Sequence, residues 1–370
     1  MKPNKIKSKI LSKNGNRIKE LDFSDTTFYI GIDVHKKSWS VTIISEGKTL
    51  VTLSMDPSPE GLVKYLHSRY PNGKYYSVYE AGFCGFWIDQ NLKALGVNNI
   101  IVSPADIPSK SKERRRKTDV VDSKKLAREL SVGNLEGIYI PTEENISLRS
   151  FVRLRMQLTN DQTRIKNRIK SLLNFKGIEI PPNTENKHWS KNFINYLYNL
   201  STKDDYMKYT LITLLDILLR IREQLLSIVK KLRTIVKANP EINNTIMYLQ
   251  SVPGVGFIIA VTFYTEIMDI ARFPRLDEIA TYVGLAPAIY SSGQKEKTLG
   301  LSKQKNKYLR NLLIQAAWVA IRKDPAMLKA YGVLRRKMSE QKAIIRITKK
   351  LLSRMRFVWS NETKYQLSVA

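Results

Sequence analysis

The chain has 370 residues and a formal net charge of +29, because 62 lysines and arginines outnumber 33 aspartates and glutamates. Its length allows two or three domains with proper cores, and a hydrophobic content of 43% excludes a mainly disordered protein. The large excess of positive charge predicts a polyanionic partner, of which nucleic acid is the commonest.

Cysteine, histidine and apolar content limit the chemistry further. The single cysteine, Cys84, excludes an internal disulfide framework and a cysteine-based zinc site. Three scattered histidines argue against a histidine-based metal site. There is no run of 18 apolar residues and no apolar leader core, so we expect a cytosolic protein that does not span a membrane.

The first 140 residues carry a strand-rich pattern after a basic start. Residues 1–27 contain seven lysines and arginines before the first acid and predict a flexible basic arm. We then expect strands at 28–34, 39–44, 49–55, 75–79 and 99–102, with helices at 59–70 and 86–95. Three strands followed by alternating helix and strand is the order of an α/β ribonuclease H-like domain, here residues 28–140. It is also the order of the actin and sugar-kinase fold.

Residues 141–242 are predicted to form a helical, coiled-coil linker. An amphipathic helix spans 148–173, and a polar, irregular insertion follows at about 177–204. In the next helix, leucine recurs every seven residues, with leucine or isoleucine three residues after each: Leu211, Leu214, Leu218, Ile221, Leu225, Ile228, Leu232 and Ile235. Four apolar heptads predict a coiled coil, paired either with the helix at 148–173 or, as this pattern favours, with another subunit.

Residues 243–370 are expected to form a mainly α-helical C-terminal domain. A turn of Pro253, Gly254, Val255 and Gly256 separates two apolar helical segments, which is the helix-hairpin-helix pattern. Exposed amides at Gly254 and Gly256 could hold a DNA phosphate, although a glycine turn between packed helices also occurs for structural reasons alone. Further helices are predicted at 276–283, 305–323 and 326–352.

Four acids are candidates for metal-dependent chemistry. Asp33 lies on the first strand, Glu80 follows the fourth, and Asp119 and Asp122 share one face of a helix start. In a ribonuclease H-like fold these segments converge at one sheet edge, where two Mg2+ ions could neutralise them and assist phosphoryl transfer. Each acid alone could equally be a surface carboxylate or helix cap. We interpret the nearby His35 as a structural neighbour.

A second candidate site contains two adjacent hydroxyls, Ser291 and Ser292, before a glycine in a lysine-rich stretch. A serine hydroxyl is a weak nucleophile until a base or a metal activates it. Basic residues around the serines and before Asp119 are candidate nucleic-acid contacts: Lys110, Lys112, Arg114, Arg115, Arg116, Lys117, Lys295, Lys297, Lys303 and Arg310.

Ordered motifs along residues 28–356 resemble transposases of the IS110 family. They are Gly31-Ile-Asp-Val-His-Lys, Tyr79-Glu-Ala-Gly, Lys117-Thr-Asp-Val-Val-Asp-Ser, Ser251-Val-Pro-Gly-Val-Gly, Val283-Gly-Leu-Ala-Pro and Ser291-Ser-Gly with Leu309-Arg. The resemblance implies a RuvC-like domain whose Asp-Glu-Asp-Asp acids match Asp33, Glu80, Asp119 and Asp122. It also implies a coiled-coil connection and a nucleophilic serine directly before the glycine, Ser292. The chain departs from the family pattern at Lys305-Asn306, where a glycine-asparagine pair is usual.

The same resemblance implies an RNA-guided DNA recombinase of an insertion sequence in a prokaryotic cytoplasm, at the nucleoid. It would cut donor and target DNA through a covalent serine–DNA intermediate, with a guide (bridge) RNA that pairs with both DNAs, as a dimer or tetramer. One alternative is a RuvC-like nuclease or junction resolvase that uses water as the nucleophile. Another is a nucleic-acid-binding protein with a decayed site. A sugar kinase is disfavoured by the +29 charge and by the lack of a glycine-rich phosphate loop.

Overall fold

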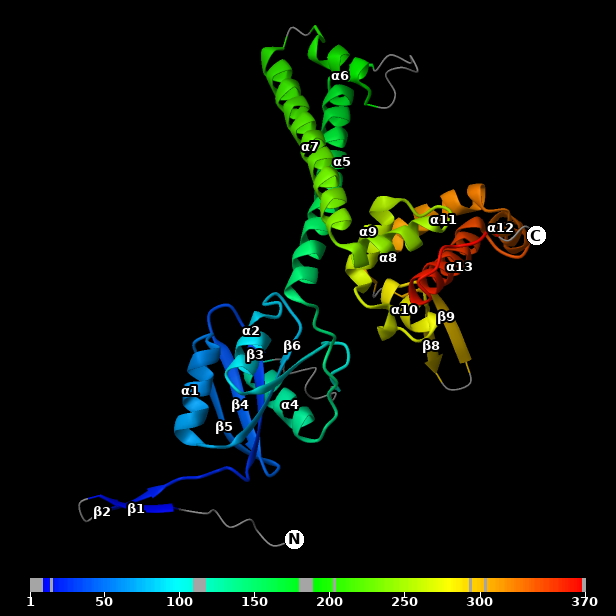
Figure 1. Cartoon of the computed structure of the whole chain (residues 1–370). Helices are drawn as coiled ribbons and strands as arrows, with labels where there is room; N and C mark the ends of the chain where they lie inside the picture. Colours follow the sequence, from blue (N-terminus) through cyan, green and yellow to red (C-terminus); the bar gives the residue numbers. More distant parts are fainter. Residues whose placement is uncertain are drawn as a thin grey trace. The chain divides into compact units, whose positions relative to one another are not determined.

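The computed structural model describes residues 9–13, 16–108, 118–179, 189–201, 204–292, 295–302 and 305–367 (Figure 1). The chain divides into two compact units, residues 1–140 and 141–370. Two short strands, β1 (Lys9–Lys13) and β2 (Asn16–Glu20), pair antiparallel within the segment predicted as a basic arm.

The first unit contains a mixed five-stranded sheet in the order β5-β4-β3-β6-β7. Its strands are β3 (Thr27–Val34), β4 (Trp39–Ser45), β5 (Lys48–Met55), β6 (Lys74–Glu80) and β7 (Asn98–Val102). The first three strands pair antiparallel, whereas β6 and β7 run parallel to β3. The predicted strands are confirmed, and this order is compatible with a ribonuclease H-like domain.

Helices cover both faces of this sheet. Helices α1 (Pro59–Arg69) and α2 (Trp87–Ala94) pack through Leu62, Leu66, Ile88 and Leu92 onto the face that carries Phe28, Ile30 and Ile32 (Figure 1). Helix α4 (Asp119–Ser131) packs against β3, β4 and β6 on the opposite face. The three-layer arrangement buries the apolar strands from both sides.

A glycine permits the close packing of α4 on the sheet. A Cβ atom at Gly31 of β3 would lie 2.1 Å from the carbonyl oxygen of Ser123 and 2.4 Å from the amide nitrogen of Ala127. Both contacts are backbone atoms of α4, so no side chain larger than hydrogen fits while the helix keeps this position. The hydroxyl of Ser123 adds hydrogen bonds to Ser40 (3.1 Å) and Thr42 (2.9 Å) of β4.

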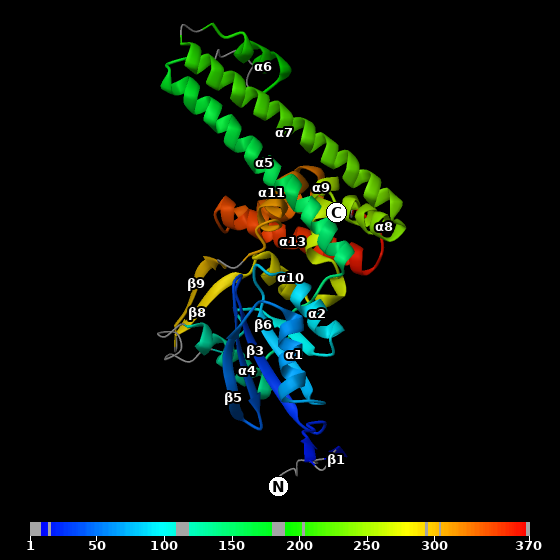
Figure 2. The same ribbon diagram turned by 90° about the vertical axis from the view of Figure 1, so that its left-hand side faces the viewer.

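The second unit begins with a long helical hairpin made of α5 (Glu143–Phe175) and α7 (Asp205–Ala238), which Figure 2 shows side by side. The two helices run antiparallel, because the end of α5 packs with the start of α7 and the start of α5 with the end of α7. The heptad leucines and isoleucines of α7 are buried or half-buried. Much of their apolar stripe is therefore used inside the chain, and the predicted coiled coil between subunits remains a proposal.

The region predicted as an irregular insertion contains a helix, α6 (Lys191–Tyr198), so that expectation was wrong for these residues. Its buried side chains Phe193, Ile194 and Leu197 join Trp189 in the core of the hairpin tip. The signal for this helix lies in these three buried residues and two partly buried tyrosines, and the polar residues on either side of the helix masked it. Residues 180–188 of the insertion lie outside the described part of the chain.

The remainder of the second unit is mainly helical, with one β-ribbon. Its elements are α8 (Pro240–Ser251), α9 (Phe257–Ile267), the 3-10 turn η2 (Ile270–Arg272), α10 (Leu276–Val283), β8 (Pro287–Ser292), β9 (Lys295–Leu301), α11 (Arg310–Lys323), α12 (Pro325–Arg335) and α13 (Glu340–Ser360). These helices share one apolar core with the base of the α5–α7 hairpin. Among the helices of the described residues, none is long and apolar enough to cross a membrane.

Two helix boundaries in this region differ from the prediction. The helix expected at 326–352 is two helices, because the chain turns between α12 and α13 and Ser339 takes an extended conformation at the start of α13. The helix expected from 305 begins at Arg310, because the side-chain oxygen of Asn306 accepts hydrogen bonds from the amides of Tyr308 (2.9 Å) and Leu309 (3.2 Å). That asparagine turn delays the helix start.

Candidate functional site

Two acids lie at the carboxyl ends of neighbouring parallel strands. The last paired residues of β3 and β6 are Ile32 and Tyr79, and Asp33 and Glu80 are the next residues along the two strands. Side chains alternate between the two faces of a strand, so Asp33 shares the face of Gly31, and Glu80 that of Val78. Gly31 and Val78 both pack against α4. The two acids therefore belong to the α4 face of the sheet.

The start of α4 brings two more acids to this edge. The hydroxyl of Thr118 accepts a hydrogen bond from the amide of Val121 (3.4 Å) and caps the helix. This places Asp119 and Asp122 in the first turn, where carboxylates are favoured by the helix dipole. Asp119, which the sequence also allowed as a helix cap, is the first residue of α4 and not its cap.

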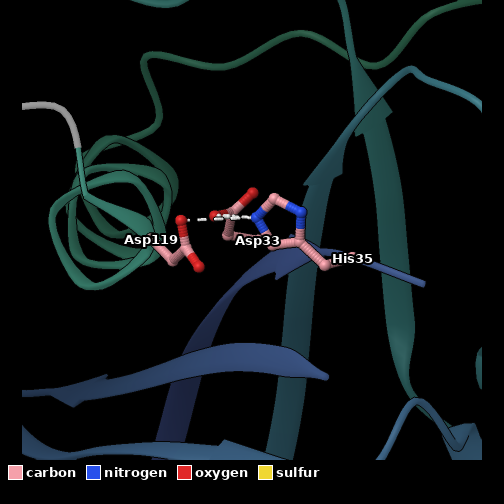
Figure 3. Close-up of side chains that lie close together, drawn as sticks. All are labelled: Asp33, His35 and Asp119. Carbon is pink, nitrogen blue, oxygen red and sulfur yellow. Dashed lines mark hydrogen bonds and ion pairs between the residues drawn. The ribbon is translucent and has the colours of Figure 1, made fainter. Parts of the chain in front are cut away.

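The side chains that converge most closely are Asp33, His35 and Asp119 (Figure 3). The imidazole Nε2 of His35 lies 3.1 Å from Asp33 Oδ2 and 3.4 Å from Asp119 Oδ1. One ligand atom from each residue lies within 4.8 Å of the others. The Asp33 side chain is 21% exposed and that of Asp119 is 64% exposed, so the cluster opens to solvent on the helix side.

The interpretation of His35 as a structural neighbour missed its place in this cluster. The sequence held one signal for it, since a residue two positions after Asp33 returns to the same side of an extended chain. Asp122 and Glu80 are outside the 4.8 Å group. Asp122 nevertheless acts electrostatically on Asp33, and Glu80 lies on the same face of the sheet. The structure thus gathers two of the four predicted acids tightly and adds a histidine.

The electrostatics of Asp33 reflect this crowding. Burial raises the pKa of the Asp33 carboxyl group, His35 lowers it through charge and a hydrogen bond, and Asp119 and Asp122 raise it again. Crowded carboxylates of this kind are favourable when a cation neutralises them. The donor set fits a divalent cation, since carboxylate oxygens suit Mg2+ or Mn2+, while an imidazole ligand shifts the preference away from a purely Mg2+ site.

The serine pair lies in the second unit, at the end of a strand. Ser291 pairs with Glu296 and Ser292 with Lys295 across the β8–β9 ribbon, and Ser292 is the last residue of β8. Gly293 and Gln294, which connect the strands, lie outside the described residues. The sequence pattern predicts no strand here. Ser292 is thus carried near the tip of a two-stranded ribbon.

A buried ionic network anchors the segment that follows this ribbon. The carboxylate of Glu266 on α9 accepts two hydrogen bonds from Arg153 of α5 (2.7 and 2.8 Å) and one from the Asn306 side chain (2.9 Å). The Glu266 residue is 1% exposed, and the Arg153 guanidinium lies 4.4 Å over the ring of Tyr308. Asn306 therefore retains a structural role although lysine precedes it in place of the usual glycine.

The other predicted nucleic-acid contacts are placed unevenly. Lys110, Lys112, Arg114, Arg115, Arg116, Lys117 and Lys303 lie outside the described residues, and Lys295 and Lys297 belong to β9. The Arg310 guanidinium donates to the carbonyl oxygen of Ser302 (3.0 Å).

The two glycines of the predicted helix-hairpin-helix turn differ from each other. A Cβ at Gly254, whose φ is +92°, would lie 2.5 Å from the carbonyl oxygen of Ala316, so packing on α11 explains this glycine. Gly256 begins α9 without a side-chain cap and has open space around it. Of the two, Gly256 remains the candidate phosphate contact.

The Thr118 cap gives a graded test of the acidic cluster. Thr118→Ala removes the side-chain acceptor of the first turn of α4 and is expected to cost about 1 kcal/mol of stability. In calorimetric titration with Mn2+, the affinity of the cluster for the cation should fall about fivefold if that energy is lost in positioning Asp119. Thr142→Ala is the matched control, because Thr142 caps α5 through Asn145 in the same way (3.3 Å). It should lower the melting temperature without changing the affinity for the cation. Equal losses of cation affinity in the two variants would contradict the assignment.

An acidic cluster at the ends of parallel strands, in a chain of net charge +29, is typical of proteins that act on nucleic acid. Comparison with protein families identifies which class of protein this is. A transposase family model for the DEDD domain of IS110 elements matches residues 30–177, and the model of the IS116/IS110/IS902 transposase family matches residues 247–332. Together they cover more than half of the chain. The chain belongs to the IS110 family of insertion-sequence transposases.

Similar curated proteins agree with this assignment. The chain is 27% identical over 363 residues to y4rJ of Sinorhizobium fredii, a protein named as a transposase, covering 88% of this chain and 89% of the relative. It is 28% identical to the transposase of IS1111A from Coxiella burnetii, over 62% of this chain and 61% of the relative. It is 27% identical to the transposase of IS1533 from Leptospira borgpetersenii, over 78% and 84% respectively.

Proposed function

We propose that this transposase cuts and rejoins donor and target DNA through a covalent link to Ser292, assisted by a divalent-cation site in a RuvC-like domain. The observation that carries the proposal is the convergence of one ligand atom each from Asp33, His35 and Asp119 within 4.8 Å. Asp122 follows in the first turn of α4, and Glu80 ends the strand next to that of Asp33. When bound there, Mg2+ would polarise a phosphate oxygen and stabilise the charge that develops on the DNA oxygens during transfer.

Ser292 is the nucleophile in this scheme. The Ser292 oxygen forms a bond to phosphorus while one bridging phosphorus–oxygen bond of the DNA strand breaks. A base takes the serine proton, and the leaving DNA oxygen takes up a proton in turn and is released as a hydroxyl group. A hydroxyl of the partner strand then attacks the same phosphorus and frees the serine, so that atoms and charge balance over the exchange.

The proposed chemistry requires Ser292 and the acidic cluster to meet. Ser292 and the acids belong to different units, so the reaction brings them together within one chain or between subunits of a dimer or tetramer. The α5–α7 hairpin is the proposed coiled-coil element of this assembly. The net charge of +29 supports binding to donor and target DNA and to a guide RNA. We place the reaction in the prokaryotic cytoplasm, at the nucleoid.

A denaturing-gel assay tests the serine. The full chain is expressed with its flanking non-coding DNA and supplied with donor and target DNA and Mg2+. The wild type and Ser291→Ala should give slow-migrating DNA that protease treatment releases, and Ser292→Ala should give none. An adduct lost only with Ser291→Ala would move the nucleophile by one residue. Cleaved DNA without an adduct in any variant would instead support the water-using nuclease.

A further inference from the structure

The base of the serine ribbon borders a large groove that the proposed chemistry does not use. Its volume is about 1370 Å³, and it is lined by residues at the ends of β8 and β9 and on α10, α11 and α13. Pro287, Gly300 and Leu301 belong to the ribbon or its immediate edge. The groove therefore opens directly beside the element that carries Ser292.

The floor of the groove is apolar and contains one accessible aromatic ring. Its lining includes Leu276, Leu285, Ile314, Ile344 and Ile345. Trp318 of α11 joins them, remains 37% exposed and packs edge-to-face on Tyr331 (5.7 Å between ring centroids). An exposed indole held by a second aromatic ring is a rigid surface on which a planar base can stack.

One wall of the groove is a basic ridge, which we define as Lys342, Arg346 and Lys350 of α13. Their spacing of four residues places them on one face of the helix, about 6 Å apart along its axis. All three are exposed, and none pairs with a carboxylate among the residues that the structure describes. By contrast, Lys349 pairs with Asp277 (2.6 Å) and Arg354 pairs with Asp324. The basic ridge is thus available for an external anion.

We propose that this groove binds an unpaired segment of the DNA strand next to the cut. Successive phosphates follow the basic ridge, and one or more bases enter the apolar floor and stack on Trp318. Charge complementarity selects a polyanion, and the apolar floor selects exposed bases, which a duplex keeps within its stack. The groove lies at the base of the ribbon whose tip carries Ser292, and this favours DNA, because a strand held at Ser292 can extend along the ribbon to the groove. The inference therefore rests on the proposed function for its choice of strand.

Binding is measurable without any cleavage. We suggest fluorescence anisotropy with a labelled ten-nucleotide single strand and the full chain carrying Ser292→Ala, so that no covalent capture occurs. In that background, Lys342→Gln, Arg346→Gln and Lys350→Gln together should weaken binding about 10- to 100-fold. They should also reduce the slope of log affinity against log salt by about 2, since each phosphate contact to a single strand contributes roughly 0.7.

A matched control removes the same charge from the same unit outside the groove. Lys323, Lys329 and Lys364 are exposed and absent from the groove lining. Their replacement by glutamine should weaken binding less than about threefold. Equal losses for both triple variants would overturn the proposal, because the effect would then be one of net charge alone.

The base-stacking step has its own test. Trp318→Ala should weaken single-strand binding about fivefold or more, whereas Trp318→Phe should keep most of it because a π-face remains. Unchanged affinity with Trp318→Ala would contradict stacking, and circular dichroism melting checks that this variant folds.

Two competitors identify the strand. The first competitor is a DNA duplex. If the basic-ridge variant loses as much affinity for the duplex as for the single strand, the choice of unpaired DNA is overturned. The second competitor is an RNA strand of the same sequence. If it binds more tightly than the DNA strand and loses more affinity in the basic-ridge variant, the choice of DNA is overturned. All of these experiments measure equilibrium binding by a Ser292→Ala protein. Their results therefore stay interpretable even if the adduct assay shows that Ser292 is not the nucleophile.

Discussion

Asp33→Asn is expected to lower the rate of DNA strand cleavage by about 10³-fold or more while the protein stays folded. Asparagine keeps the size of the side chain but removes the charge that, with Asp119, would hold a divalent cation. Metal stabilisation of transition-state charge contributes several kcal/mol, and each 1.36 kcal/mol corresponds to tenfold in rate. Cleavage of end-labelled donor DNA at saturating Mg2+ measures the loss.

Stability should move in the opposite direction. Burial and the neighbouring carboxylates raise the pKa of Asp33, so folding without metal disfavours its ionised form. The neutral asparagine removes that penalty, and the melting temperature of the metal-free variant should be unchanged or higher. Added Mg2+ or Mn2+ should raise the melting temperature of the wild type but not of Asp33→Asn, because a ligand stabilises the state that binds it.

Asp106→Asn is the control for both measurements. Asp106 is exposed, lies in the same unit and is outside the cluster. It should leave the cleavage rate and the metal-induced shift as in the wild type. Asp33→Asn cleaving within tenfold of the wild type, or keeping its metal-induced shift, would show that Asp33 is not a metal ligand in the reaction.

Local sequence patterns were enough to predict most of the structure of the first unit. Continuous apolar strands and a threonine cap can be recognised within a few residues, and the β3–β6 pairing then brings Asp33 beside Glu80 without further information. His35 was missed because its partner Asp119 is 84 positions away, and only the packing of α4 on Gly31 brings them together. The prediction of an oxygen-only cluster followed from residue types, whereas the inclusion of His35 in the cluster depends on that packing.

In the second unit, local sequence patterns predicted less of the structure. The heptads of α7 correctly predicted a long apolar stripe, but the stripe alone does not identify its partner, and α5 covers much of it within the same chain. The β8–β9 ribbon was missed because serines, lysines and glycines interrupt the apolar alternation in its sequence. The segment that follows the ribbon is anchored by a distant group, since the Asn306 side chain donates to the buried Glu266, 40 positions earlier. Such long-range polar contacts leave no periodic pattern.

Gly31→Ala should disrupt the acidic cluster although residue 31 carries no functional group. The new Cβ would lie 2.1 Å from the carbonyl oxygen of Ser123, far inside a normal contact of about 3.5 Å, so α4 must move by about 1 Å or more. That shift carries Asp119 away from Asp33 and strains the hydrogen bonds of Ser123. Overpacking of this kind costs about 1–3 kcal/mol, and a 1 Å misplacement can cost about 100-fold in rate.

Gly61→Ala separates this packing effect from the general effect of replacing glycine. Gly61 lies in α1, and a Cβ there would meet its nearest neighbour, Ser58, at 3.4 Å. Alanine should therefore stabilise α1 by about 0.5–1 kcal/mol and leave cleavage unchanged. Thermal melting with and without Mg2+, together with the cleavage rate, distinguishes the two variants. A Gly31→Ala protein with wild-type cleavage would mean that the contact between α4 and β3 does not position the acids, and that the cluster forms independently of the helix.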